Sequence, residues 1–170
     1  INLVSLETSL EDLSVLAADC LIPFEFISAP SGTFFDIGTG AGFPSIVLLM
    51  AFSSLRGTVI ERTRKKAGFV RSIVHVFDLN AEVHDYDLTE VFARLDTGSY
   101  DYGFMKLVRL DKNIMRMIDE LLSENGRFIY YSDFDTQRLA VPNGITIDQY
   151  SYYLNNDDNL KKVSVFSRNA

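Results

Sequence analysis

A β-forming run leads directly into closely spaced glycines in the segment Thr33-Phe34-Phe35-Asp36-Ile37-Gly38-Thr39-Gly40-Ala41-Gly42. Glycine has no β-carbon, so the backbone amides of such a loop can approach a ligand closely where a strand meets a helix. From Phe43 or Pro44 onward, apolar residues at 46, 47, 49, 50 and 51 follow helical spacing, and proline is tolerated in a first helical turn. The segment therefore predicts a strand, a ligand-binding loop and a buried helix.

The glycine spacing indicates the kind of ligand. Gly38, Gly40 and Gly42 form G-x-G-x-G, whereas dinucleotide binders carry G-x-G-x-x-G. Phe43 stands where the third glycine of a dinucleotide binder falls. The carboxylate of Asp36 would repel a pyrophosphate, but it can orient the loop and reach an amino or ribose group. S-adenosylmethionine is a nucleoside cofactor without phosphate, so we predict that it binds here.

A second acid follows the next predicted strand, residues 58–60. Glu61 lies about 20 residues beyond the loop, where a carboxylate can accept hydrogen bonds from both ribose hydroxyls of a nucleoside cofactor. The alternative is a surface ion pair with Arg64 or Lys65 at helical spacing. The glycine loop and Glu61 together favour the cofactor site.

Further polar side chains surround the third predicted strand, residues 81–84. Asp85 and Asp87 follow it, where the adenine of such a cofactor would lie, and either carboxylate could accept the exocyclic amine. The two histidines, His75 and His84, have no cysteine or carboxylate partner at metal-ligand spacing. We therefore predict no metal site and leave both aspartates open as adenine contacts.

Strand-like and helix-like segments alternate along the chain, which is the pattern of a mostly parallel α/β sheet with helices on both faces. Residues 33–170 are expected to form this Rossmann-like core and residues 1–32 a helical entry segment, in one domain of residues 1–170. The predicted strands are 33–37, 58–60, 81–84, 100–105 and 128–131, with a closing antiparallel hairpin of 145–153 and 163–166 around the polar stretch 155–159. The predicted helices are 10–21 behind a Ser9 cap, 63–77, 88–95 and 114–122, the last one stopped by Glu124-Asn125-Gly126.

Composition narrows the class of protein. A chain of 170 residues that is 47% hydrophobic can bury one sizeable core but is too short for two ordinary domains. No apolar stretch is long enough for a membrane-spanning helix, and no basic segment leads into an apolar run at the N-terminus. The single cysteine, Cys20, cannot form an internal disulfide. We expect a cytoplasmic protein without a membrane partner.

The charge is unevenly distributed. A net charge of −7 argues against nucleic acid as a partner, because phosphate binding relies on lysine and arginine. Yet six cations crowd a short segment opposed only by Glu61, namely Arg56, Arg62, Arg64, Lys65, Lys66 and Arg71. This segregation permits a local basic surface on an acidic protein, with a solvated helix face as the alternative.

The string from Phe35 to Pro44, followed by Glu61-Arg62-x-x-Lys65-Lys66-x-x-Phe69, resembles one family. It is similar to the glucose-inhibited division protein B family, bacterial methyltransferases that modify guanine N7 in the 530 loop of 16S ribosomal RNA. Gly-Ala-Gly-Phe-Pro is more specific than a generic glycine loop, and the resemblance extends from Asn2-Leu3 to about Gly126. It implies the class I S-adenosylmethionine-dependent methyltransferase fold, with 16S rRNA or the 30S subunit as partner. We expect a monomer.

The resemblance also implies roles for single residues. Lys106 takes the place of a family arginine after the fourth strand, and Lys106 and Arg109 are our catalytic candidates, facing the base or its phosphates. The alternative for both is a solvated loop charge. The family's histidine before the first strand and its arginine after the third are absent, with Tyr86 or Asp87 in the latter region. The expected cofactor contacts are Asp36, Gly38, Thr39, Gly40, Gly42, Phe43, Glu61, Arg62, Asp85 and Asp87, and the expected substrate contacts are Arg62, Lys65 and Lys66.

The expected chemistry needs no acid-base pair. Guanine N7 carries an in-plane lone pair, so rate would come from alignment of the methyl group with the nucleophile. Two alternatives stay open: a methyltransferase of a protein or small molecule, and a noncatalytic cofactor-binding module. A nicotinamide-dependent dehydrogenase is less favoured because the chain is too short for a second domain. Hydrolase and kinase motifs are absent from the sequence.

Overall fold

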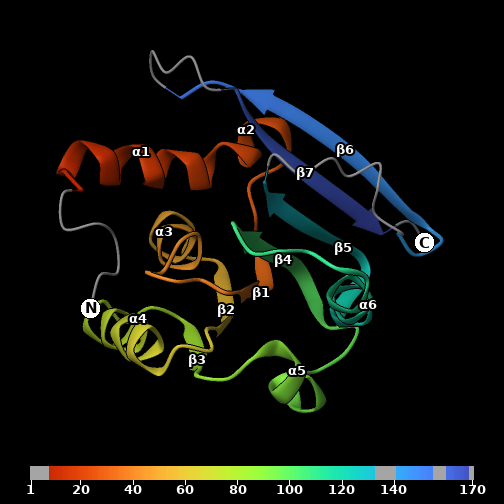
Figure 1. Ribbon diagram of the computed structural model, residues 1–170, viewed down its shortest axis with the longest axis horizontal. Helices are drawn as coiled ribbons and strands as arrows, with labels where there is room; N and C mark the ends of the chain where they lie inside the picture. The colour runs from red at the N-terminus through yellow and green to blue at the C-terminus, as the bar shows by residue number, and fades with distance from the viewer. Residues whose placement is uncertain (1–7, 133–140, 155–159, 169–170) are drawn as a thin grey trace.

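Seven strands form one sheet in the order β3-β2-β1-β4-β5-β7-β6 in the computed structural model, which describes residues 8–132, 141–154 and 160–168 (Figure 1). Strands β1 to β5 pair in parallel, and β7 pairs antiparallel with both β5 and β6. The expected C-terminal hairpin is therefore confirmed, with β6 at the sheet edge. The predicted polar stretch 155–159 and the segment Asn2-Leu3 lie outside the described residues. The strands are β1 (Gly32–Ile37), β2 (Leu55–Ile60), β3 (Ala81–His84), β4 (Tyr100–Lys106), β5 (Leu122–Tyr131), β6 (Ile145–Tyr152) and β7 (Lys161–Arg168).

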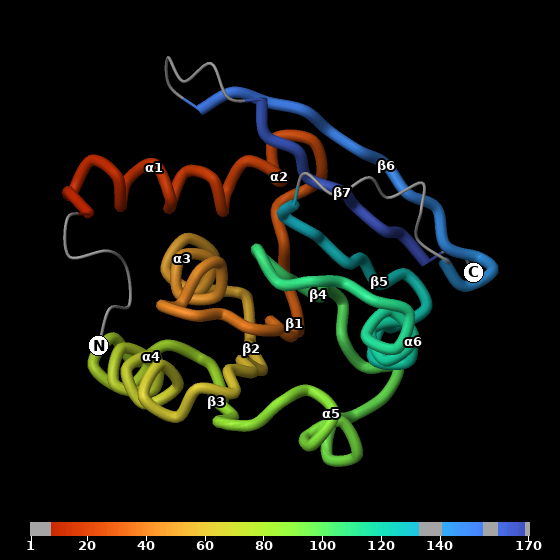
Figure 2. The backbone as a smooth tube through the Cα atoms, viewed as in Figure 1, coloured from red at the N-terminus to blue at the C-terminus, as the bar shows by residue number. Residues whose placement is uncertain are grey.

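Helices cover both faces of the sheet. In Figures 1 and 2, α1, α3 and α4 lie on one side, and α5 and α6 lie on the other. Alternation along β1 explains this layering, because Phe34 packs with the cluster that α1 and α3 contact, whereas Phe35 packs with the α5 and α6 cluster. The expected α/β fold is confirmed. The helices are α1 (Leu10–Leu21), α2 (Pro23–Phe26), α3 (Ser45–Ala51), α4 (Arg64–Val76), α5 (Leu88–Val91) and α6 (Lys112–Leu121), with a 3₁₀ turn η1 (Phe92–Arg94).

The entry helix α1 begins where the sequence predicts. The Ser9 hydroxyl accepts a hydrogen bond from the Asp12 amide at 3.0 Å, and the Asp12 carboxylate accepts one from the Ser9 amide at 2.8 Å. Such a reciprocal cap contributes about 1 kcal/mol to helix stability. Val15 and Leu21 pack against the core cluster that also contains Phe34. The helix is thereby fixed on the sheet.

The predicted stop at Glu124-Asn125-Gly126 is wrong. Helix α6 ends at Leu121, and β5 begins at once with Leu122, which is fully buried and pairs with Tyr100. The register then shifts, so that Tyr102 pairs with Arg127 and the predicted stop falls in the irregular part of β5. Leu122 continues the helical apolar pattern of α6, but its side chain is buried as the first residue of a strand. Burial in the core therefore outweighed the local turn signal.

Two further boundaries also differ from the prediction. The strand expected at 58–60 begins earlier, because buried Leu55 pairs with Gly32 of β1. The helix expected over 88–95 is divided into the short α5 and the η1 turn. Neither change moves the carboxyl end of a strand, so the positions of the loops that follow the strands are unaffected.

Candidate functional site

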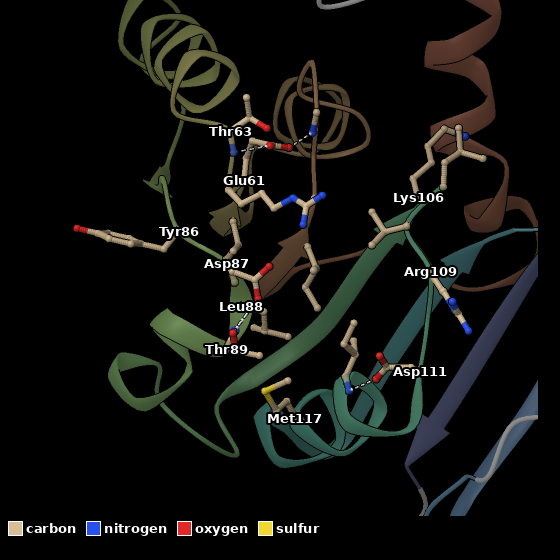
Figure 3. A pocket seen from close by; sticks show the side chains of 18 of the residues that line it. Glu61, Thr63, Tyr86, Asp87, Leu88, Thr89, Lys106, Arg109, Asp111 and Met117 are labelled. Atoms are coloured by element: carbon tan, nitrogen blue, oxygen red, sulfur yellow. Dashed lines mark hydrogen bonds between the residues drawn. The ribbon is translucent and has the colours of Figure 1, made fainter.

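A cavity of about 720 Å³ opens at the carboxyl ends of the central parallel strands (Figure 3). Ile37, Ile60 and Lys106 end β1, β2 and β4 respectively, and all three line the cavity. Strand order reverses at β1, since the chain runs from β1 to β2 and β3 on one side and then crosses to β4 on the other. This is the place where open α/β sheets bind their ligands.

The glycine loop forms one wall of the cavity. Gly38, Gly40 and Gly42 have φ angles of 73°, 61° and 101°, in the left-handed region that favours glycine. A β-carbon at Gly38 would lie 2.6 Å from Val108 Cγ2, and one at Gly42 would lie 2.6 Å from Ile46 Cγ1. A β-carbon at Gly40 would meet only a carbonyl oxygen at 4.0 Å. Two glycines therefore permit close packing, whereas Gly40 leaves its space free for a ligand.

Glu61 ties this loop to the start of α4. Its Oε2 accepts a hydrogen bond from the Gly40 amide at 2.9 Å, and its Oε1 accepts one from the Thr63 amide at 2.8 Å, as Figure 3 shows. These backbone amides, rather than Arg64 or Lys65, hold the carboxylate. The side chain lines the cavity, and each of its oxygens retains a lone pair for a further donor.

Asp36 lies behind the glycine loop and does not line the cavity. It is fully buried, and its Oδ2 accepts hydrogen bonds from the amide and hydroxyl of Ser45, at the start of α3. Burial raises the pKa of the Asp36 carboxyl to about 7, against the lowering effect of these hydrogen bonds. Its Oδ1 is buried without a hydrogen-bond partner in the described part of the chain. Asp36 therefore joins the loop to α3 and retains one free acceptor.

Lys106 lines the cavity, but its ammonium forms an ion pair with Asp19 of α1. Figure 3 shows the side chain turned toward α1. Asp19 also accepts a hydrogen bond from the Tyr152 hydroxyl at 2.8 Å and lies 3.4 Å from Lys161 Nζ. Burial alone would raise the pKa of Asp19, but these partners outweigh it and hold the pKa below its ordinary value. The charge of Lys106 is thus compensated inside the protein.

The structure brings some of the other predicted residues to the cavity and leaves others away from it. Asp87 lines the cavity and caps α5 by accepting a hydrogen bond from the Thr89 amide at 3.1 Å. Asp85 does not line it and lies 3.7 Å from Arg71. Of the remaining predicted residues, Gly38, Gly40, Arg62, Lys66 and Arg109 line the cavity, whereas Thr39, Gly42, Phe43 and Lys65 do not. Of the three expected substrate contacts, Arg62 and Lys66 therefore lie at the cavity and Lys65 lies away from it.

Several lining residues were missed by sequence reasoning. The segment after β4 contributes Leu107 and Val108, and α6 with its cap contributes Asp111, Asn113 and Met117. Asp111 caps α6 by accepting hydrogen bonds from the Asn113 and Ile114 amides at 2.9 Å. An aspartate three residues before Ile114, where the apolar pattern of α6 begins, was a recognisable cap signal. The capped end of α6 lies at the carboxyl edge of the sheet and therefore at the cavity.

Within residues 8–132, 141–154 and 160–168, no group of three or more histidine, cysteine or acidic side chains is arranged to hold a metal ion. No helix within the same ranges is long and apolar enough to cross a membrane.

Solved structures with the same fold include several that are named as methyltransferases. The putative methyltransferase yhhF from Escherichia coli has a TM-score of 0.72 at 13% identity, covering 91% of this chain and 86% of that one. A SAM-dependent methyltransferase from Aquifex aeolicus has a TM-score of 0.67 at 15% identity, covering 94% and 93%. At such low identity the likeness shows the fold alone, and it confirms the predicted class I methyltransferase fold.

Curated relatives share more of the sequence. The ribosomal RNA small subunit methyltransferase G of Syntrophus aciditrophicus is 40% identical over 80 residues, which are 46% of this chain and 33% of that protein. Its counterpart in Psychrobacter arcticus is 28% identical over 153 residues, which are 83% of this chain and 63% of that protein. The chain thus spans less than two thirds of the length of these relatives. A family model described as rRNA small subunit methyltransferase G matches residues 1–140, and the chain therefore belongs to this GidB family, as the resemblance predicted.

Proposed function

We propose that this chain binds S-adenosylmethionine in the cavity at the carboxyl edge of the sheet and methylates N7 of a guanine in the 530 loop of 16S ribosomal RNA. The observation that carries the proposal is the pairing of the glycine loop with Glu61 at this cavity, in a chain of the GidB family. The cavity volume of about 720 Å³ suits a nucleoside cofactor, since small-molecule sites span roughly 300–1,000 Å³.

The residues present fit this cofactor. Glu61 offers two acceptor oxygens for ribose hydroxyls, and Asp87 offers a carboxylate for the adenine amine. The open space at Gly40 would be filled by any larger side chain. The buried Oδ1 of Asp36, just behind the loop, is an acceptor that an ordered water would satisfy. Bound S-adenosylmethionine would supply an electrophilic methyl group on a positively charged sulfur.

The proposed transfer is a single displacement. The N7 lone pair forms the new N–C bond, the C–S bond breaks, and its electron pair stays on sulfur. The positive charge therefore passes from sulfur to the purine ring, so a cation beside the ring would oppose the reaction. We propose that the cations at the cavity hold phosphates instead. Arg62, Lys66 and Arg109 line the cavity, and none forms an ion pair with another residue that the structure describes.

Lys106 has a different role in this proposal. Its charge is compensated by Asp19, so it adds little net field at the purine ring. Its side chain is 8% exposed and forms part of the cavity wall. We propose that Lys106 shapes the wall next to the methyl acceptor, while Arg109, which is exposed, contacts the RNA backbone.

We propose, further, that residues 1–170 act as one domain and as a monomer in the cytoplasm. Support for one domain comes from the entry segment, whose Val15 and Leu21 pack on the core that contains Phe34. Light scattering at micromolar concentration tests the monomer. A mass near 19.2 kDa is expected for the isolated chain, and twice that value would contradict it.

The proposed activity is tested by methyl transfer from radiolabelled S-adenosylmethionine to 30S subunits and to 16S RNA, both isolated from cells that lack this protein. Label should appear in 7-methylguanine. Glu61→Gln should lower transfer and cofactor affinity together, because it weakens the acceptor for ribose and the link to Gly40. Glu82→Gln is the matched control, since that side chain is 75% exposed on β3 and lies outside the cavity. Absence of label from guanine with the wild-type chain would contradict the proposal.

A second candidate is methyl transfer to a protein or small molecule. The observation that favours it is the compensation of Lys106 by Asp19, together with the net charge of −7, which both reduce the attraction of RNA. Calorimetric binding of S-adenosylmethionine without any label in ribosomal RNA would support this candidate or a noncatalytic module over the first.

A further inference from the structure

Leu107, the first residue after β4, combines two unfavourable features at the rim of the cavity. Its side chain is 84% exposed, and its φ angle is +57°. Left-handed backbone is uncommon for a bulky residue, and such outliers gather at functional sites. The other described non-glycine residue with positive φ is Asp78, a residue type that tolerates this conformation. An exposed leucine with left-handed backbone at this position therefore points to a functional role.

The conformation of Leu107 is held by its neighbours. Its amide donates a hydrogen bond to the Tyr131 carbonyl at 3.3 Å, and the Tyr130 hydroxyl donates one to the Val108 carbonyl at 3.0 Å. The side chain of Val108 fills the space beside Gly38 that a β-carbon would occupy. The segment of Leu107 and Val108 is thus held against β5 and the glycine loop. It presents Leu107 outward while Val108 turns inward.

The surroundings of Leu107 suit a nucleic-acid strand. It lines the same cavity as the cations Arg62, Lys66 and Arg109. An apolar side chain among cations can contact a base face while the cations hold phosphates. Enzymes that act on a base take it out of the stack, and apolar side chains such as leucine can enter the step that opens.

We infer that Leu107 is a wedge that packs against the base next to the target guanine when that guanine enters the cavity. This inference rests on the proposed function and assigns to Leu107 the stabilisation of the unstacked RNA. Leu107 does not contact the reacting atoms in this role, so its effect depends on how the guanine is stacked in the substrate.

The test compares Leu107→Ala, Leu107→Met and Leu107→Gly with Leu10→Ala. Leu10 is the matched control, because it is 83% exposed at the start of α1 and does not line the cavity. With 30S subunits as substrate, Leu107→Ala should lower kcat/KM about tenfold, since most of the apolar contact of the wedge is lost. Leu107→Met should keep most of the activity, and Leu10→Ala should keep all of it. Calorimetry should give one affinity for S-adenosylmethionine in all variants.

A second substrate separates the wedge from a structural role. In a short oligonucleotide whose guanine is flanked by abasic sites, no stack has to be opened, so the wild-type chain and Leu107→Ala should give equal kcat/KM. Leu107→Gly removes the side chain and also relieves the backbone. It should unfold at higher urea concentration than the wild-type chain and yet lose activity on 30S subunits as Leu107→Ala does.

The outcomes are distinguishable. Equal activity of Leu107→Ala and Leu10→Ala on 30S subunits would overturn the wedge and leave the proposed function standing. An equal loss of Leu107→Ala on both substrates would also overturn it, because a structural defect does not depend on stacking. If the wild-type chain transfers no methyl group to either RNA, the proposed function fails and the wedge fails with it.

Discussion

Asp19→Asn should lower the free energy of unfolding by about 3–5 kcal/mol, the cost of leaving a buried charge without its partner. The two side chains of this ion pair are 4% exposed at Asp19 and 8% exposed at Lys106. Asparagine keeps the shape of the side chain and an acceptor for the Tyr152 hydroxyl, which lies 2.8 Å away. The substitution therefore removes mainly the charge.

The loss can be assigned to Lys106 with a second substitution. Lys161 also faces Asp19, at 3.4 Å, but its side chain is 31% exposed, so that contact contributes only about 0–1 kcal/mol. Lys106→Met removes the ammonium and keeps an apolar stem over the Tyr131 ring. The double variant no longer has a buried unpaired charge, so it should regain about 2–3 kcal/mol relative to the sum of the single losses.

The assay is urea unfolding of the wild-type chain, both single variants and the double variant at pH 7. Glu11→Gln, on the exposed side of the same helix, is the control and should change stability by less than about 0.5 kcal/mol. Additive losses, with a coupling energy below about 0.5 kcal/mol, would refute the reasoning, because they would mean that the two charges do not interact.

The same pair predicts a pH dependence. The pKa of Asp19 is lower in the folded chain than its ordinary value of 3.8. A group of this kind contributes stability that is fully present above the unfolded pKa and is lost as the pH falls through the folded value. The difference in stability between the wild-type chain and Asp19→Asn should therefore shrink below about pH 4.

Substitutions and labelling at four other positions give further expected outcomes. Gly38→Ala should destabilise the fold by about 1–3 kcal/mol, since its methyl group would lie 2.6 Å from Val108 on left-handed backbone. Gly68→Ala, which has open space around it on α4, should stabilise the fold by up to about 1 kcal/mol in the same urea assay. Burial raises the pKa of Asp36 from its ordinary value of 3.8 to about 7. The stability that this group contributes is fully present below pH 3.8 and should be lost as the pH rises through about 7. Asp36→Asn should flatten this dependence in unfolding measured from about pH 5 to 8. Cys20 is fully buried with its pKa raised to about 12, so a thiol reagent at pH 8 should label it only after unfolding in urea.

Features set by backbone geometry were predictable from the sequence. The loop at Gly38 and Gly40 and the acid at Glu61 follow strands whose apolar runs are easy to recognise, and parallel strands bring their carboxyl ends to one edge. Their spacing was therefore enough to place them beside one cavity. The end of α6 was not predictable in the same way, because Leu122 fits a helical and a strand pattern equally well and only its burial against β4 separates the two.

Side-chain partners across the fold were beyond the sequence. Asp19 and Lys106 stand 87 positions apart, and nothing local in either segment indicates the other. Parallel strands bring their carboxyl ends to one edge of the sheet, and this strand-end rule placed the backbone of Lys106 correctly. A lysine has a long flexible stem, however, and the ammonium of Lys106 reaches away from the cavity to α1. A strand-end rule is therefore reliable for residues that act through backbone or short side chains, and it is weak for long cations. Under the proposed function, recognition of phosphate would therefore depend on the cavity cations that have no described ion-pair partner, Arg62, Lys66 and Arg109, and not on Lys106.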